Sequence, residues 1–417
     1  MAIKQKVSPK LSALLSIYVN GWGLLFVLLS GLSACAPHPA THLQPTIAKD
    51  PVTAFKLRVD RLREELDIPG LSIVVLHRQQ ILFAEGFGYA DLEKKIPATP
   101  ETPYNIASLT KPFSATVLMK LEEEDRLDLD AELAVLLEKK LIERGNQTIH
   151  GYSEACQKIK KASRNPFFRH ASLLRDYRCE SERITVRHLL THTAQGVPGE
   201  NFRYNGFLFG FLSSVAEVAS GKDFEKILVE TIIAPLGMAR TIPSWDDRLR
   251  DRAWGERSTY YQKRLFGFVP SEYRTRLSAS AGMVSTVMDL AKFDMAMDRD
   301  LIVSQETKEA MFTATRSNSG KRLPYGLGWF VQEHNGMKLI WQYGHAPQAY
   351  SSLFLKCPDR KATLILLANS DGASAPFHLG EGDVMKSPFA SAFIAFSDRM
   401  ILTPRMVEGA RKVEPCI

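Results

Sequence analysis

Cysteine is scarce in this chain, and several signals that would point to a function are missing. Only five of the 417 residues are cysteine, and their spacing does not match a metal site. No basic helix with interleaved aromatic residues and no nucleic-acid motif is present, which argues against nucleic acid as a partner. The net charge of +7 is modest. The chain is 45% hydrophobic and has no long low-complexity tract, so it can bury a large core.

The N-terminus resembles an export signal. Lysines occur in the first ten residues, an apolar run extends over 11–31, and residues 32–35 read Leu-Ser-Ala-Cys. This tetrapeptide resembles a bacterial lipobox, in which the cysteine, here Cys35, is lipidated and becomes the new N-terminus. We expect a lipoprotein signal peptide at 1–34, a tether at 35–52, and an extracytoplasmic body anchored by lipid to a bacterial membrane, on its periplasmic face. An uncleaved signal anchor is the alternative, because the apolar run is long enough for one.

If Cys35 is lipidated, four cysteines remain in a compartment that permits disulfides. Cys156 and Cys179 lie in one segment, about 137–183, which looks like a basic insertion on the surface, and they are the candidate pair. A bridge between Cys357 and Cys416 is a weaker alternative.

Strand patterns occur toward both ends of the chain, and helical patterns lie between them. The two ends are therefore expected to form one sheet, from about 53–104 and 316–417, with a mostly helical domain inserted at about 105–315. This order predicts an α+β fold in which an antiparallel sheet is flanked by N- and C-terminal helices. Strands are predicted at 71–76, 81–89, 325–331, 338–341, 350–355 and 363–368, and the flanking helices at 52–66 and 389–400.

A single Ser-x-x-Lys occurs in the chain, at Ser108 and Lys111. On a helix these two positions share one face, which brings the lysine amine within reach of the serine hydroxyl. Serine becomes a nucleophile only when a base takes its proton, and lysine can be that base only if its pKa falls from about 10.4. The same residues are also typical of an ordinary helix start with Ser108 as the cap.

Six sequence pieces in one order make the chain resemble the serine β-lactamase-like family. That family includes class C β-lactamases, D-alanyl-D-alanine carboxypeptidases and family VIII esterases, and the resemblance covers roughly residues 53–370. It implies a β-lactamase/transpeptidase-like fold. The pieces are Ser-Leu-Thr-Lys at 108–111, His-Leu-Leu-Thr-His-Thr at 188–193, Pro-Leu-Gly-Met at 235–238, Gly-Met-Val-Ser-Thr at 282–286, Tyr-Gly-Leu-Gly-Trp at 325–329 and Tyr-Gly-His at 343–345.

The resemblance also implies a catalytic tyrosine. The family motif Tyr-x-Asn is matched by Tyr204-Asn205-Gly206, so the tyrosine is kept and glycine replaces the asparagine. In the family this tyrosine shares the proton between nucleophile and leaving group. We expect Lys111 to depress the pKa of Tyr204 so that the phenol can accept a proton. The missing asparagine argues against efficient turnover of β-lactams and peptides.

The third family motif, Lys-Thr-Gly or His-x-Gly, is matched by His345-Ala346-Pro347. The resemblance implies that the backbone N–H groups of Ser108 and Gln348 form the oxyanion hole. Proline has no N–H, but the second donor lies one residue beyond it, so the hole survives. An unperturbed histidine is mostly neutral at pH 7, so neutral esters should be handled better than substrates that carry a carboxylate.

Together these residues predict a serine hydrolase that forms an acyl-enzyme on Ser108, with Lys111, Tyr204 and His345 as its other catalytic residues. No metal and no cofactor is expected. The substrate would be an ester or amide, either a small molecule or a peptidoglycan-like one, with esterase or D-amino-peptidase-like activity favoured over β-lactamase activity. The alternative is a non-hydrolytic penicillin-binding or cell-wall-binding lipoprotein that acylates slowly or not at all.

Overall fold

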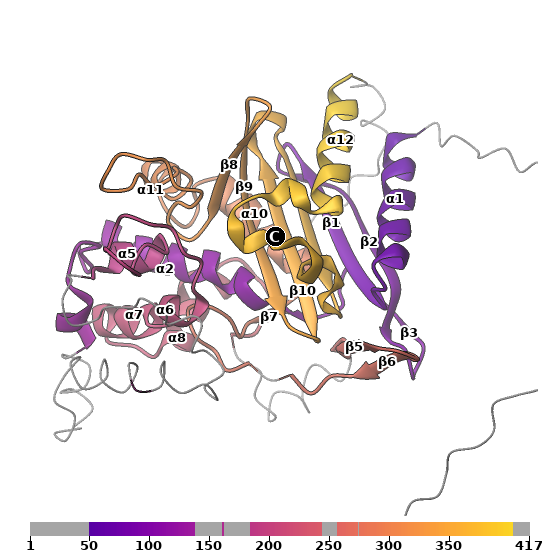
Figure 1. Cartoon of the computed structure of the whole chain (residues 1–417), viewed down its shortest axis with the longest axis horizontal. Coiled ribbons are helices and arrows are strands. Elements are labelled where there is room, and N and C mark those ends of the chain that lie inside the picture. Colours follow the sequence, from indigo (N-terminus) through magenta and orange to yellow (C-terminus); the bar gives the residue numbers. More distant parts are fainter. Residues whose placement is uncertain (1–49, 138–160, 162–183, 244–256, 274, 403–417) are drawn as a thin grey trace, which may run out of the picture. The chain divides into compact units, whose positions relative to one another are not determined.

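The computed structural model describes residues 50–137, 161, 184–243, 257–273 and 275–402 (Figure 1). The predicted signal, most of the predicted tether and nearly all of the basic insertion lie outside these residues, as do Cys35, Cys156 and Cys179. Cys357 is described and has a free, buried thiol, whereas Cys416, its alternative partner, lies outside the described residues. No helix in the described part of the chain is long and apolar enough to cross a membrane.

A seven-stranded sheet forms the centre of the fold, with the strand order β3-β2-β1-β11-β10-β9-β8. Its central pair joins the two ends of the chain, because β1 and β11 are antiparallel from Leu71–Ala368 to His77–Ala362. All of its strand pairs are antiparallel, which confirms the predicted α+β fold. The strands are β1 (Gly70–His77), β2 (Gln80–Asp91), β3 (Ile96–Pro97), β8 (Phe330–His334), β9 (Met337–Ala346), β10 (Tyr350–Cys357) and β11 (Ala362–Ala368).

Each face of the sheet packs against its own set of helices. Side chains alternate along a strand, so Ile73 and Val75 of β1 enter one core whereas Val74 and Leu76 enter the other. Helices α1 (Pro51–Glu65) and α12 (Pro388–Leu402) lie together over the first face, and α10 (Val287–Asp298) packs on the second (Figure 1). Because both faces are covered, β1, β10 and β11 are buried along almost their whole length.

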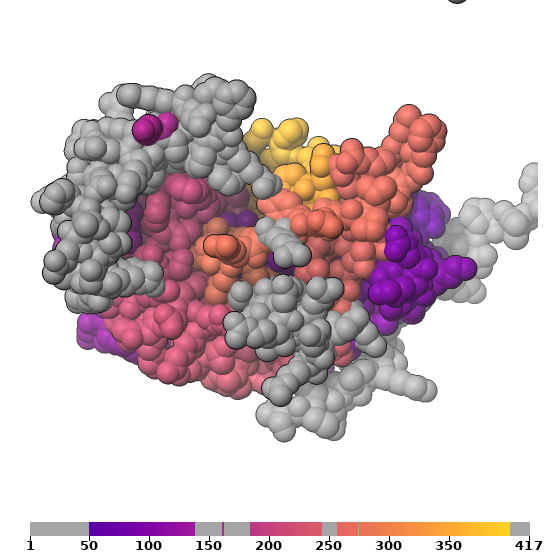
Figure 2. All heavy atoms as spheres, turned by 90° about the horizontal axis from the view of Figure 1, so that it is seen from below, coloured from indigo at the N-terminus to yellow at the C-terminus, as the bar shows by residue number. Residues whose placement is uncertain are grey.

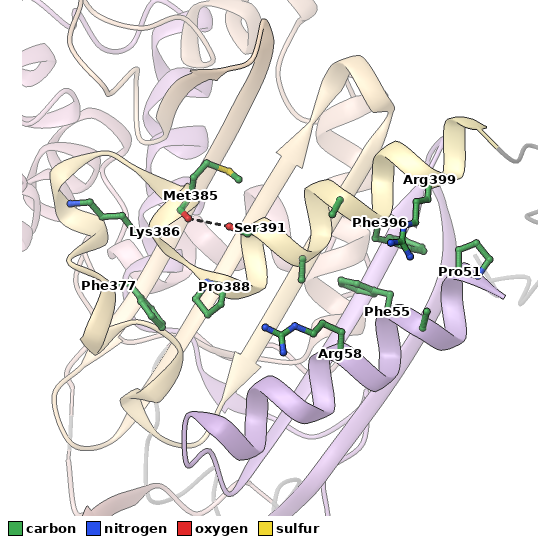
Figure 3. Close-up of a pocket in the computed structure, with 13 residues that line it drawn as sticks. Pro51, Phe55, Arg58, Phe377, Met385, Lys386, Pro388, Ser391, Phe396 and Arg399 are labelled. Carbon is green, nitrogen blue, oxygen red and sulfur yellow. Dashed lines mark hydrogen bonds between the residues drawn. The ribbon is translucent and has the colours of Figure 1, made fainter. Parts of the chain in front are cut away.

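A pocket of about 570 Å³ lies between α1 and α12 (Figure 3). Phe55 and Phe396 stack at its wall with 4.7 Å between ring centroids, and Arg58 and Arg399 also line it. Ser391 donates a hydrogen bond of 3.1 Å to the carbonyl of Met385 at the other end. None of the predicted catalytic residues lines this pocket.

Helices are the main regular structure between the two halves of the sheet, and most of them are short. From below, their magenta to pink atoms lie beside the orange atoms of later segments (Figure 2). One helical stretch is divided into an α-helical part, Phe224–Leu228, and a π-helical turn, Val229–Ile233. The helices are α2 (Thr110–Glu123), α5 (Val186–Leu190), α6 (Gly206–Phe209), α7 (Leu212–Ser220), α8 (Phe224–Leu228) and α11 (Gln305–Met311).

One element in this segment was not predicted. A hairpin of β5 (Tyr261–Arg264) and β6 (Gly267–Pro270) packs against the sheet rather than among the helices. The N–H of Tyr261 donates to the carbonyl of Asn369 at 2.8 Å, and its hydroxyl accepts the N–H of Leu92 at 2.8 Å. Its strands are mostly exposed, so the alternation of apolar and polar residues that marks a half-buried strand is absent.

Candidate active site

Ser108 lies in a short 3-10 turn, Ala107–Leu109, which leads directly into α2. Ala107 has φ of +49°, a left-handed conformation that is uncommon for a residue with a side chain. The turn is held from both sides, because Asn105 Oδ1 accepts the N–H of Ala107 at 3.0 Å and Thr110 Oγ1 donates to the carbonyl of Ala107 at 2.8 Å. A strained turn fixed in this way presents the serine in one orientation.

A second segment anchors this turn. Strand β4 (Tyr104–Asn105) pairs with β7 (Val284–Ser285), and the N–H of Ile106 donates to the carbonyl of Met283 at 3.0 Å. Gly282 has φ of +120°, and a Cβ there would lie 2.5 Å from Cα of Leu277. Only glycine fits at this position without a shift of the backbone. The close turn before β7 brings Ser280 next to the nucleophile.

Lys111 contacts both of these segments. Its Nζ donates to Ser108 Oγ at 2.9 Å and to the carbonyl of Ser280 at 3.0 Å. The side chain is completely buried, and no carboxylate among the described residues pairs with it. Burial lowers the pKa of Lys111 to about 7, because the charged form loses its hydration. Near neutral pH the amine can therefore accept a proton from Ser108.

Tyr204 lies over the same amine, with 5.0 Å between Lys111 Nζ and the centre of the ring. Burial raises the pKa of Tyr204 well above its ordinary value, and the neighbouring Tyr343 and Tyr325 raise it further. The polar side chains of Ser108 and Gln342 lower this pKa, but by less. The expectation that Lys111 depresses this pKa is therefore wrong. The buried hydroxyl has no hydrogen-bond partner among the described residues. Tyr204 is a neutral phenol near pH 7, and so a proton donor rather than a base.

His192 supports the ring of Tyr204 from behind, with 4.5 Å between the ring centroids. Its Nδ1 accepts the N–H of Asn205 at 3.1 Å. Burial lowers the pKa of His192 well below its ordinary value, and Lys111 lowers it further, so the ring is neutral. Sequence reasoning used this histidine only as part of a family motif and assigned it no contact with Tyr204.

Gly206 occupies the position at which the family has asparagine, and the structure shows that this position faces the site. A Cβ on Gly206 would lie 3.6 Å from Lys111 Nζ. Asn205 cannot take over the missing side chain's role. Its Oδ1 caps α6 by accepting the N–H of Leu208 at 3.0 Å, and its Nδ2 donates to Gln195 Oε1 at 2.9 Å. Neither Gly206 nor Asn205 therefore places a side-chain amide beside Lys111.

The end of β9 passes close to the nucleophile turn. A Cβ on Gly344 would lie 2.6 Å from the carbonyl oxygen of Ile106, so glycine permits this approach. His345 follows, with its side chain 32% exposed. The chain then reverses over residues 346–349, where the N–H of Ala349 donates to the carbonyl of Ala346 at 3.1 Å. Gln348 has φ of +59° in this turn.

The N–H of Gln348, the second predicted oxyanion donor, already makes a hydrogen bond within the protein. The N–H of Gln348 donates to Oδ2 of Asp371 at 2.6 Å, and the same oxygen lies 4.0 Å from Nε2 of His345. Burial alone would raise the pKa of Asp371, but the nearby His345 ring and the hydrogen bond from the N–H of Gln348 bring it below its ordinary value. Sequence reasoning missed Asp371, because Asn-Ser-Asp-Gly at 369–372 has the composition of a turn.

The structure thus brings the predicted residues into two adjacent groups. Ser108, Lys111 and Tyr204 form the first, and His345 and Gln348 with Asp371 form the second. They meet where Tyr204 contacts Tyr343 of β9, at 5.4 Å between ring centroids. Ala107 and Ala346 also share one small apolar cluster. Within the described ranges no group of three or more His, Cys, Asp or Glu side chains could hold a metal ion.

Comparisons with known proteins identify relatives of this chain. A sequence profile described as Beta-lactamase matches residues 55–381. The chain is 25% identical over 332 residues to penicillin-binding protein 4* of Bacillus subtilis, which covers 72% of this chain and 68% of that protein. It is 24% identical over 347 residues to D-aminopeptidase of Brucella anthropi, which covers 79% of this chain and 61% of that protein.

A solved structure shares the fold. The octameric penicillin-binding protein homologue from Pyrococcus abyssi superposes with a TM-score of 0.63 at 24% sequence identity, covering 86% of this chain and 79% of that chain. At this level of identity the superposition shows the fold alone. The β-lactamase/transpeptidase-like fold expected from the sequence is confirmed.

Proposed function

The chain belongs to the beta-lactamase family, and from this premise we propose that it is a serine hydrolase that forms an acyl-enzyme on Ser108. The observation that carries the proposal is the 2.9 Å contact between Lys111 Nζ and Ser108 Oγ. Burial places the pKa of that amine at about 7. A fully buried lysine without a carboxylate partner destabilises a fold, so the contact is better explained by its use as a base.

The acylation step follows from these positions. As Ser108 Oγ bonds to the carbonyl carbon, neutral Lys111 takes its proton, and the N–H of Ser108 stabilises the developing oxyanion. Tyr204 donates its phenolic proton to the leaving group as the bond from the carbonyl carbon breaks, and it recovers a proton from Lys111. A water molecule then attacks the acyl carbon, which releases the acid and restores the hydroxyl of Ser108.

The surroundings of Gly206 favour one class of substrate. An asparagine there would offer an amide that recognises the amide of a β-lactam or peptide, and this chain has none. We therefore favour an ester, or an amide with few contacts on its acyl side, over a β-lactam. The D-aminopeptidase and penicillin-binding protein relatives support acyl transfer from a carbonyl substrate, either a small molecule or one related to peptidoglycan.

Three measurements on the purified protein test this function. A fluorophosphonate probe should label Ser108, and a chromogenic aryl ester should be hydrolysed. Mass spectrometry at short reaction times should find the acyl group of the ester on the peptide that contains Ser108. A protein that is neither labelled nor active on any member of an ester and amide panel would contradict the proposal.

A second candidate function has one observation in its favour. Because Asp371 occupies the N–H of Gln348, the oxyanion hole has one donor fewer than the family arrangement. Such a site could acylate slowly and act as a penicillin-binding or cell-wall-binding protein. Labelling of Ser108 by the probe without measurable turnover of any ester would favour this function over hydrolysis.

We also propose that the protein is lipid-anchored through Cys35, supported by Leu-Ser-Ala-Cys at 32–35 after an apolar run. Replacing Cys35 with alanine should prevent labelling by a radioactive fatty acid and block removal of the signal. Intact-mass measurement of the wild-type protein should show a chain that begins at a diacylated Cys35. A wild-type chain that retains residues 1–34 would contradict the anchor.

A further inference from the structure

We propose that Asp371 determines which substrates the site accepts, because it holds the Gln348 N–H until a positively charged acyl group draws its carboxylate away. The inference rests on the proposed function, since it concerns how Ser108 is acylated. Its consequence is that an acyl group carrying a cation is favoured over a neutral group of the same shape.

Hydrogen bonds on both sides of Asp371 fix its backbone. It follows β11 and begins a 3-10 turn, Asp371–Ala373, that is fixed to β10 on both sides. Ser351 Oγ donates to the carbonyl of Ser370 at 2.6 Å and accepts the N–H of Ala373 at 3.2 Å. The 2.6 Å bond from Gln348 N–H to Asp371 Oδ2 therefore joins two ordered turns. It is a charge-assisted bond, stronger than one between neutral groups.

This bond lies beside the nucleophile. The turn that contains Gln348 begins at Ala346, which packs in one cluster with Ala107, the neighbour of Ser108. Gln348 is held with φ of +59°, where glycine or asparagine is more usual, and its N–H is turned to Asp371. A non-glycine residue kept in such a conformation next to a catalytic serine is a sign of a functional constraint.

The N–H of Gln348 cannot make a full hydrogen bond to the Asp371 carboxylate and to the oxyanion at the same time. When Ser108 attacks a neutral substrate, the oxyanion competes with the Asp371 carboxylate for the Gln348 N–H. The two negative charges also repel each other, and water screens only part of this repulsion because Asp371 is half-buried. Acylation by neutral substrates is therefore slower than the arrangement of Ser108 and Lys111 alone would allow.

A cation on the acyl group removes both obstacles. No lysine or arginine among the described residues forms an ion pair with Asp371, and His345 Nε2 at 4.0 Å is its one basic contact. The carboxylate is also partly exposed, with 28% of the side chain accessible. A substrate ammonium group can therefore pair with it, which neutralises the charge and frees the N–H for the oxyanion. A carboxylate on the acyl group would meet the opposite effect.

The test uses two aryl esters whose acyl groups have the same shape, trimethylammonioacetyl with a fixed cation and 3,3-dimethylbutanoyl without charge. Each ester is measured with wild-type protein, Asp371→Asn and Asp371→Ala. Asp371→Asn keeps an acceptor for the N–H but removes the charge, whereas Asp371→Ala removes both. The control is Asp359→Asn, because Asp359 also accepts a backbone N–H, that of Lys338 at 2.9 Å, at the opposite end of β9.

We expect Asp371→Asn to lower the preference for the cationic ester about tenfold, the size of one charge-assisted contact. The kcat/KM for the neutral ester should rise in both Asp371 variants, and it should rise more in Asp371→Ala than in Asp371→Asn. Asp359→Asn should leave kcat/KM unchanged for both esters. Comparing each variant with wild type removes the intrinsic difference in reactivity between the esters.

Two results would overturn the inference while the proposed function stands. The first is an unchanged ratio between the two esters in both Asp371 variants. The second is a parallel loss on both esters, which would mean that Asp371 only supports the turn; circular dichroism shows whether the variants fold. Wild-type protein that neither ester acylates would instead overturn the proposed function, and the inference with it.

Discussion

Ser108→Ala is expected to abolish covalent labelling and to lower kcat for the best ester by a factor on the order of 10⁶. The alanine removes the only atom that bonds to the acyl group, and Lys111 then has no hydroxyl to deprotonate. The fold should remain, because the turn around Ser108 is held by the Asn105 and Thr110 side chains and not by the serine hydroxyl.

The measurement combines probe labelling, ester turnover and thermal unfolding of the same preparations. A suitable control is Ser114→Ala, because Ser114 is a buried serine of α2, the next helix, and its hydroxyl donates to the carbonyl of Thr110 at 3.0 Å. That variant should keep its labelling and most of its activity. If Ser108→Ala is still labelled on another residue, the nucleophile has been assigned wrongly.

Lys111→Met should have opposite effects on activity and stability. Activity should fall by about 10² to 10⁴, the usual contribution of a general base, because the hydroxyl of Ser108 loses its proton acceptor. Stability should rise, because methionine fills a similar volume without burying a titratable group. The lost hydrogen bonds to Ser108 and Ser280 reduce this gain but do not reverse its sign.

The pH dependence of stability shows whether the gain in Lys111→Met comes from removing a titratable group or only from better packing. In the unfolded chain the lysine binds a proton below about pH 10.4, whereas in the folded chain the pKa of Lys111 is about 7. Wild-type stability therefore falls as the pH decreases from about 10.4 to 7, by at most about 5 kcal/mol, and this loss remains at lower pH. The advantage of Lys111→Met should be largest at pH 7 and smallest above pH 10.4.

Urea unfolding of both proteins at pH 7 and at pH 10 measures this difference, because the other titrating groups are common to both. Wild-type kcat/KM should rise with pH through about 7, as Lys111 loses its proton. A stability difference that is the same at both pH values would show that Lys111 is charged in the folded protein, and its assignment as the base would then fail.

Parts of the site that depend on local spacing could be predicted from the sequence. Ser108 and Lys111 are three residues apart, and helical geometry alone places their side chains together. Gly344 and His345 were found through a family pattern. Most strands of the sheet were also predictable as short apolar runs, but the strand expected at 325–331 was placed wrongly, because β8 is Phe330–His334. Asn335-Gly336 has the positive φ angles expected at the turn between β8 and β9.

Parts that depend on packing between distant segments could not be predicted. The pKa of Tyr204 is set by burial among aromatic rings from β8 and β9, including Phe330 at 5.4 Å and Tyr343 at 5.4 Å between ring centroids. Asp371 meets Gln348 only because β9, β10 and β11 lie side by side in the sheet. No spacing in the sequence relates either residue to Ser108.

Asp371 also changes what His345 can be expected to do. The sequence indicated that His345 faces the anionic end of a substrate, but a carboxylate already lies 4.0 Å from its Nε2. A lysine at this position would pair with Asp371 before it paired with a substrate. The expected preference for neutral over carboxylated substrates thus has a second physical reason, independent of the protonation of the histidine.

The pairing of β1 with β11 has a consequence for how the protein is made. Leu71 finds its partner Ala368 only after nearly the whole chain has been synthesised. Closing so long a loop is slow, and contacts of high sequence separation lengthen folding times. Until then β1 and β2 form a hairpin with an open, apolar edge that is prone to aggregate. The catalytic centre cannot be complete before β9 joins the sheet, because His345 lies near the end of this strand and Gln348 just beyond it.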